Sequence, residues 1–307
     1  MEKKINLGLV DSSYTYDGKD AAEFYSEALL TGNSKSLFRQ FSGVKNTINV
    51  PSLNMGSFLQ ADACALYAEG NYTLDTKPLS TCDVGFKVPF CVKDWEPLFL
   101  SKAMRDGSNA DNNYPQGVVS YIWEQMKMYI SKDVEYLTFQ GSTTASPPDL
   151  CDGLQKLLLA DATVIDVAVD GTKLHAKATV IGELEEMYAA IPNTIKFREN
   201  LRLMINPATA AAYKLAMVTN HPALYASNNG DFGLNFMDIP IVVCPGLGDY
   251  KAILCDPQNL WFGTDLISDE EYMDFTQDPL NKKQHYATGS FRIGFNFGNG
   301  SEIVYYN

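Results

Sequence analysis

The clearest pattern of apolar and polar positions lies between residues 116 and 140. The apolar residues of this segment recur three or four positions apart, as on one face of an α-helix: Val119, Ile122, Met126, Tyr129, Ile130 and Leu137. At about 1.5 Å per residue, such a helix would be about 36 Å long, roughly twice the average length. We therefore predict a long amphipathic helix that serves as a spine on which other parts of the chain pack.

A second pattern, with a period of two residues, flanks a long insertion between residues 43 and 92. Residues 44–53 read as an outgoing strand, and residues 82–92 read as a returning strand with Val84, Phe86, Val88 and Phe90 on one side. About thirty small, polar and aromatic residues lie between them, which is unusual inside a compact domain. Because an isolated hairpin is marginal in water, we expect a second surface to cover this one.

The N-terminal region contains one short amphipathic segment. Residues 21–30 read as a helix with Phe24, Ala28 and Leu29 on one stripe, and Gly32 and Asn33 end it. A helix of this length is marginal unless it packs against something. We therefore expect it to dock on another element.

Residues 150–255 alternate between helical and strand patterns. The sequence predicts a helix near residues 150–161, a hairpin that turns at Asp170 and Gly171, and a helix from about Gly182. A strand then feeds a helix at Pro207, and two short apolar strands follow. The tail returns to strands, with a hairpin turn of positive φ expected at residues 298–300. The predicted fold class is α+β, with a mixed α/β unit between extended β-segments.

Four positions of the tail alternate with polar residues, as expected for a strand with one buried face: Phe291, Ile293, Phe295 and Phe297. Residues 305–307 continue a strand pattern, so this end of the chain should be tied into a sheet.

Composition limits the classes of function. The chain has 307 residues, of which 46% are hydrophobic, so it can bury a substantial core. It carries 24 basic and 37 acidic residues and a formal net charge of −13. Because affinity for nucleic acid depends mostly on cations that contact phosphates, this charge argues against direct sequence reading of DNA.

The cysteines and apolar runs indicate the compartment. No C-x-x-C pair occurs among Cys64, Cys82, Cys91, Cys151, Cys244 and Cys255. Free buried thiols in a reducing compartment are the favoured interpretation, while disulfides or a metal site stay open. The N-terminus lacks a signal-like apolar stretch and no run approaches the roughly 20 apolar residues that cross a bilayer, so we expect a cytosolic protein when made, without a membrane partner.

Candidate chemistry is sparse. His175, His221 and His285 have no other His or Cys at ligand spacing. Acidic residues near position 183 begin a predicted helix, where they oppose the positive end of its dipole, and those at 269–274 lack the spacing of a calcium-binding loop. No nucleophile motif or phosphate loop is present. We expect no catalytic, cofactor-binding or metal site.

The order of these elements resembles the major capsid protein of tailed bacteriophages, whose fold is named after the Hong Kong 97 phage. Residues 83–98 are similar to a loop arm that runs into the spine, residues 201–216 to the axial strand and helix, and residues 255–263 to the lead into the last long strand. The resemblance implies five parts: an N-terminal arm (1–42), an extended loop (43–92), a peripheral domain with the spine helix (93–146), an axial domain (147–255) and peripheral return strands (256–307).

The resemblance also implies partners. Copies of the chain would form pentamers and hexamers of an icosahedral shell that encloses double-stranded DNA without sequence-specific binding. A separate scaffold protein, a portal and decoration proteins are further partners that the family implies. The shell would be assembled in the host cytoplasm and would become the virion capsid. Since arm and loop lie across neighbouring subunits in the family, the implied contacts are Phe24, Leu29 and Phe38 of the arm and Phe58, Tyr67, Tyr72 and Lys77 of the loop.

Two alternatives stay open at this point. An encapsulin-like nanocompartment shell would enclose a cargo enzyme instead of DNA. A cytosolic α/β enzyme would have its pocket around His175 and the acidic residues Glu183, Glu185 and Glu186.

Overall fold

The structure is a computed structural model that describes residues 14–17, 34–55, 72–91, 116–145, 149–167, 173–220, 234–265, 272–281 and 284–307. The chain divides into two compact units. The first unit comprises Met1–Gly32, Asp83–Val134 and Asp265–Ile293, and the second comprises Asn33–Cys82, Glu135–Thr264 and Gly294–Asn307. The helix predicted at residues 21–30 lies outside the described residues.

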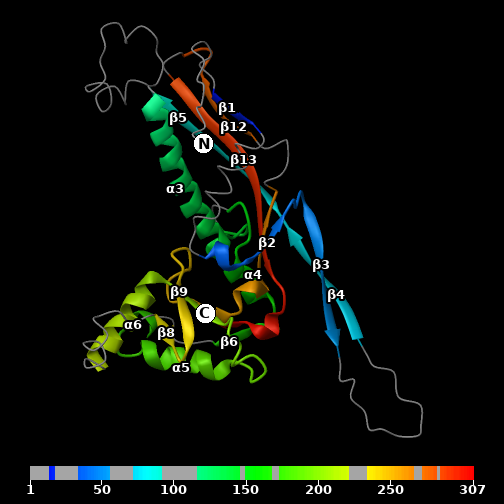
Figure 1. Cartoon of the computed structure of the whole chain (residues 1–307), viewed down its shortest axis with the longest axis vertical. Helices are drawn as coiled ribbons and strands as arrows, with labels where there is room; N and C mark the ends of the chain where they lie inside the picture. Colours follow the sequence, from blue (N-terminus) through cyan, green and yellow to red (C-terminus); the bar gives the residue numbers. More distant parts are fainter. Residues whose placement is uncertain are drawn as a thin grey trace, which may run out of the picture. The chain divides into compact units, whose positions relative to one another are not determined.

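The spine helix is confirmed as α3, Gln116–Gln140 (Figure 1). Ile122, Met126 and Leu137 are buried, as their spacing predicts, whereas Tyr129 is 64% exposed and does not belong to the buried face. The helix passes from the first unit into the second at Val134 and Glu135.

One sheet has the strand order β1-β12-β13-β11-β2, with β5 also paired to β13. Its strands are β1 (Tyr14–Asp17), β12 (Tyr272–Gln277), β13 (Gln284–Phe297), β11 (Leu260–Thr264), β2 (Arg39–Ser42) and β5 (Cys82–Cys91). All four apolar residues that alternate in the tail pattern lie in β13 and are buried, which confirms that prediction.

A separate two-stranded ribbon consists of β3 (Thr47–Met55) and β4 (Tyr72–Ser80), paired antiparallel. The outgoing strand of the predicted hairpin is therefore confirmed as β3. The predicted returning strand is confirmed as β5, Cys82–Cys91, but its predicted pairing is wrong, because β5 pairs with β13 and not with β3. Thr81 alone separates β4 from β5, so two consecutive strands of similar pattern belong to different sheets.

The mixed α/β unit is built on a six-stranded sheet with the order β6-β14-β10-β7-β9-β8. Its strands are β6 (Ile165–Val167), β14 (Val304–Tyr306), β10 (Ala252–Cys255), β7 (Arg202–Ile205), β9 (Ile239–Val243) and β8 (Asn235–Phe236). The helices of this region are α4 (Leu154–Ala160), α5 (Val180–Ala190) and α6 (Pro207–Asn220). Residues that alternate along the central strands, such as Leu203 and Ile205, share one apolar core with Leu184 of α5 and Tyr213 of α6.

Local sequence signals explain the start of α6. The helix begins at Pro207, as predicted, and the side chain of Asn206 accepts a hydrogen bond of 2.8 Å from the Ala208 N–H. This contact satisfies one of the N–H groups that a helix start leaves without a partner. The strand and helix predicted from residues 201–218 are thus confirmed.

Two turn predictions are wrong. Residues after the expected turn at Asp170 and Gly171 form a 3₁₀ turn, Lys173–His175, and then α5, while β6 pairs in parallel with β14 rather than with a return strand. Residues 300–302 likewise form a 3₁₀ turn that links strands of two different sheets. Among the described glycines only Gly43 has a positive φ. Gly300 is needed for space, because a Cβ there would collide with the Thr163 hydroxyl.

The C-terminal strand is tied down, as predicted, because β14 lies between β6 and β10. Residues 304–306, which the resemblance groups with the peripheral return strands, pair with β6 and β10 of the mixed α/β unit. The division into five parts stays a prediction.

A buried charged pair lies at the second-unit end of α3. The Lys35 side chain is 0% exposed, and its Nζ atom lies 3.8 Å from a carboxylate oxygen of Glu135, which is 6% exposed. Ser34 donates a hydrogen bond from its hydroxyl to Glu135. Burial lowers the pKa of Lys35 to about 8, and the negative charge of Glu135 offsets part of that shift. These contacts join residues 34–35 to the spine helix.

Candidate assembly interface

The root of the ribbon is held by an apolar cluster. Val50 and Leu79 are buried with Trp261 of β11, and Ile48 and Phe41 pack against them. In the antiparallel register Ile48 faces Leu79 and Val50 faces Lys77, so these residues lie on one face of the ribbon. We call this face the root face. It secures the ribbon to its own unit.

The opposite face of the ribbon is apolar farther from the root. Tyr72 and Leu74 alternate with Thr73 along β4, so they lie on the face opposite Leu79, and each is 66% exposed. Their register partners are Met55 and Leu53. We call the exposed surface formed by Tyr72 and Leu74 the distal face. Among the described strands, β3 and β4 pair only with each other.

Lys77 forms a polar anchor next to the root cluster. Its Nζ atom lies 3.0 Å from a carboxylate oxygen of Asp161 and 3.5 Å from the ring centre of Phe297. It also donates a hydrogen bond of 3.4 Å to the Gly298 carbonyl. Hydrogen bonds from the side chain and backbone of Thr163 lower the pKa of Asp161 to about 2, and Lys77 adds to that shift.

We expect the Asp161→Asn variant to be less stable than wild type at neutral pH, by an amount that falls as the pH is lowered. The pKa of Asp161 is lower in the folded chain than its ordinary value of 3.8, so its contribution is present above about pH 4 and is lost as the pH falls through about 2. At neutral pH the partly exposed pair with Lys77 should contribute about 1 kcal/mol or less. Urea unfolding at pH 6 and pH 3 measures the free energy of unfolding of both proteins. The difference between wild type and Asp161→Asn should be smaller at pH 3. An unchanged difference would contradict the assignment.

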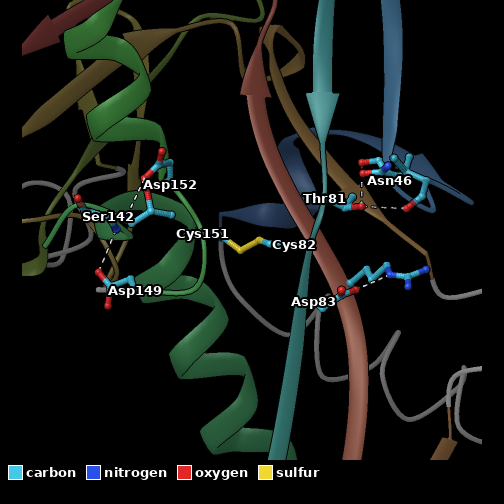
Figure 2. The surroundings of a disulfide bond; sticks show 11 residues. Asn46, Thr81, Cys82, Asp83, Ser142, Asp149, Cys151 and Asp152 are labelled. Carbon is cyan, nitrogen blue, oxygen red and sulfur yellow. Dashed lines mark hydrogen bonds and ion pairs between the residues drawn. A yellow bond between two sulfur atoms is a disulfide. The ribbon is translucent and has the colours of Figure 1, made fainter. Parts of the chain in front are cut away.

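A disulfide joins Cys82 to Cys151 across a sequence separation of 69 residues (Figure 2). The favoured expectation that all cysteines are free thiols is therefore wrong for this pair. Cys91, Cys244 and Cys255 are free, as expected, and the last two are fully buried. Burial raises the pKa of both the Cys244 and Cys255 thiols, which keeps them protonated and unreactive. Cys64 lies outside the described residues.

The two ends of the disulfide are braced in different ways. On one side, Thr81 donates its backbone N–H to the Asn46 carbonyl at 2.8 Å, which closes the root of the ribbon. On the other side, Asp149 accepts a hydrogen bond of 2.9 Å from the Ser142 N–H, and Asp152 accepts one of 2.8 Å from the Thr143 N–H. Figure 2 shows these braces on either side of the sulfur atoms.

The structure places three of the residues that the resemblance implied as subunit contacts. Tyr72 is exposed on the distal face. Phe38 is 3% exposed and packs edge-on against Phe139, so it has almost no surface left for a neighbouring subunit. Lys77 is engaged within its own chain, as described above. Phe24, Leu29, Phe58 and Tyr67 lie outside the described residues, and their interface role stays a prediction.

The residues of the enzyme alternative lie in ordinary structural contacts. The His175 ring stacks on Tyr250, with ring centres 4.0 Å apart, and Nε2 of His175 accepts a hydrogen bond from the Tyr250 N–H at 3.4 Å. Glu183 is buried and accepts a hydrogen bond of 3.0 Å from the Tyr306 hydroxyl. Glu185 and Glu186 are exposed on α5. These contacts hold α5 and the sheet together.

Within the described ranges, no group of three or more His, Cys, Asp or Glu residues is arranged to hold a metal ion. None of the described helices combines the length and apolarity needed to span a bilayer.

The comparisons with known proteins agree on the fold. No protein-family model and no curated protein matches the sequence. Among solved structures, the satellite phage P4 procapsid aligns with a TM-score of 0.62 at 12% identity and covers 96% of this chain and 92% of that chain. The capsid of the native GTA particle gives 0.60 at 14% identity, with 91% and 89% covered. The capsid of Myoviridae phage XM1 gives 0.52 at 9% identity, with 100% and 98% covered. These structures are phage and GTA capsids, and this chain has their fold.

Proposed function

We propose that this chain is a structural major capsid protein that assembles, as pentamers and hexamers, into an icosahedral shell around a phage double-stranded DNA genome. The observation that carries the proposal is the distal face, where Tyr72 and Leu74 are exposed on a ribbon whose own root packs through its other face. A ribbon with exposed apolar residues gains stability when another surface covers it. On a capsid fold, a second copy of the chain is the surface that a shell supplies.

The parts of the chain would take the roles that the resemblance implies. The arm (1–42) and the extended loop (43–92) would contact neighbouring subunits, and the axial domain (147–255) would meet its copies at the centres of pentamers and hexamers. The peripheral domain would contain the spine helix and the long return strands. A scaffold protein, a portal and decoration proteins would join during assembly in the host cytoplasm. The net charge of −13 is consistent with a shell that does not bind the packaged DNA tightly.

The distal face can be tested with a matched pair of variants. Leu74→Asp places a charge on the distal face, and Thr73→Asp places the same charge on the opposite face at the adjacent position. Burying an unpaired charge costs several kcal/mol, so we expect Leu74→Asp to abolish shells and Thr73→Asp to leave them intact. Negative-stain microscopy and size-exclusion chromatography after expression measure assembly, and circular dichroism checks that both variants fold.

Normal shells from a folded Leu74→Asp variant would contradict the role of the distal face. Absence of any shell from the wild-type chain, with or without its neighbouring gene products, would contradict the proposed function itself.

The contents of the particles separate a phage capsid from a nanocompartment. A capsid assembled during infection should protect DNA from nuclease, whereas a nanocompartment should contain a cargo enzyme and no genome. The matched solved structures are phage and GTA capsids, which favours the first outcome.

A further inference from the structure

The disulfide lies where it can control the ribbon. Cys82 is the first residue of β5, and Thr81 alone separates it from the end of β4. Cys151 lies in the turn between α3 and α4. All of these residues belong to the second unit. The disulfide therefore links the root of the ribbon to the turn between α3 and α4 of the same unit.

Both strands of the ribbon are coupled to Cys82 through Thr81. The Thr81 hydroxyl donates to the carbonyls of Asn46 and Val44 at 3.1 and 3.2 Å, in addition to the N–H bond to Asn46. Asn46 immediately precedes β3. A bond that fixes Cys82 thus fixes the roots of β3 and β4 together.

The turn that contains Cys151 is rigid. The Gly153 N–H donates to the Gly141 carbonyl at 2.7 Å, and Asp152 forms an ion pair of 2.6 Å with Lys156 at the start of α4. A Cβ at Gly141 or Gly153 would collide with the backbone on the other side of the turn. This turn cannot follow a movement of the ribbon.

Exposure lets a soluble oxidant reach Cys82. Cys82 and Cys91 are partly exposed, whereas Cys151 is 4% exposed and Cys244 and Cys255 are fully buried, so of the two partly exposed thiols only Cys82 has a partner with which it forms a disulfide in the structure. A soluble disulfide such as glutathione disulfide can be attacked by Cys82 first, which releases one glutathione. Cys151 then attacks the mixed disulfide and releases the second, so the two protein thiols lose two electrons and two protons while the oxidant becomes two thiols.

We propose that Cys82 and Cys151 form a redox-operated latch on the ribbon. Oxidation fixes the ribbon root to the turn after the spine helix. Reduction removes this covalent link and leaves the ribbon held by non-covalent contacts, among them the root cluster, the Lys77 contacts and the hydrogen bond from the Asn296 side chain to the Pro78 carbonyl, so that the ribbon becomes more mobile. The role of this latch in hardening a finished shell rests on the proposed function, whereas the latch itself does not.

Hydrogen exchange on the full-length chain tests the latch. Protein reduced with a phosphine is compared with protein oxidised by glutathione disulfide, and peptide mapping establishes whether Cys82 and Cys151 are joined. We expect amides of residues 47–55 and 72–80 to exchange at least about fivefold faster in the reduced protein. The Cys82→Ser/Cys151→Ser variant should exchange fast under both conditions, whereas Cys91→Ser should respond as wild type does.

Equal exchange in the joined and reduced proteins would overturn the latch, as would failure of the pair to join under oxidising conditions. The readout does not require shells, so a response without assembly would support the latch and count against the proposed function. If shells form, oxidised wild-type shells should resist heating better than those of the double serine variant.

Discussion

The Lys35→Met variant should gain roughly 3 kcal/mol of unfolding free energy at pH 7, because it removes an ammonium group whose charged form the fold disfavours. Burial lowers the pKa of Lys35 to about 8 although Glu135 lies 3.8 Å away, so the attraction of Glu135 does not offset the cost of burying the charge. Methionine has nearly the shape of lysine without the charge, so packing should change little. Chemical denaturation at pH 7 measures the gain.

The double variant Lys35→Met/Glu135→Leu is the matched control. Replacing both members of a buried ion pair by apolar residues is often neutral or stabilising, so we expect it to be at least as stable as wild type. A loss of stability in both variants would show that packing, and not the cost of the buried charge, dominates at this site.

The same lysine predicts a pH dependence. The folded chain holds the Lys35 proton less tightly than the unfolded chain, because burial lowers its pKa from 10.5 to about 8. Between these values the unfolded chain binds more protons, so the contribution of Lys35 to the unfolding free energy rises with pH. The stability advantage of Lys35→Met over wild type should therefore shrink from pH 8 to pH 10.

The second large effect is expected for Gly294→Ala in β13. A Cβ at this position would collide with the Ser80 carbonyl oxygen and lie 2.9 Å from its carbon and 3.0 Å from the Thr81 Cα. All three atoms belong to the backbone at the root of the ribbon, so no side chain can rotate away. We expect a loss of about 1–3 kcal/mol or more, together with faster hydrogen exchange in residues 72–80.

Gly182→Ala is the control for Gly294→Ala. A Cβ at Gly182 meets nothing within 4 Å, and the residue lies inside α5. Alanine should therefore stabilise the chain by about 0.5–1 kcal/mol. Equal effects of the two substitutions would contradict the steric argument at Gly294.

The sequence could predict elements whose signals are local. The spacing of Ile122, Met126 and Leu137 located α3, and Pro207 located the start of α6. The alternation from Phe291 to Phe297 located the buried face of β13. Each of these patterns is contained within a few helical turns or one strand, so it does not depend on which distant segment packs against it.

Pairing partners could not be predicted in the same way. The strands β4 and β5 both alternate, and no local signal indicates that β4 pairs with β3 while β5 pairs with a strand about 200 residues later. The Cys82–Cys151 bond and the buried Lys35–Glu135 pair join segments far apart in sequence, so spacing gives no hint of them. For Lys77, spacing gives no hint of the ion pair with Asp161 of the same chain, and its contact with a neighbouring subunit stays a prediction.

The position of β14 has a consequence during protein synthesis. This strand lies between β6 and β10, and it pairs with Ile165–Val167 about 140 residues earlier in the chain. A ribosome must therefore release residues 304–306 before the sheet can close, and such long-range pairing is slow. Until then β6 and β10 have open edges that a chaperone could protect from aggregation.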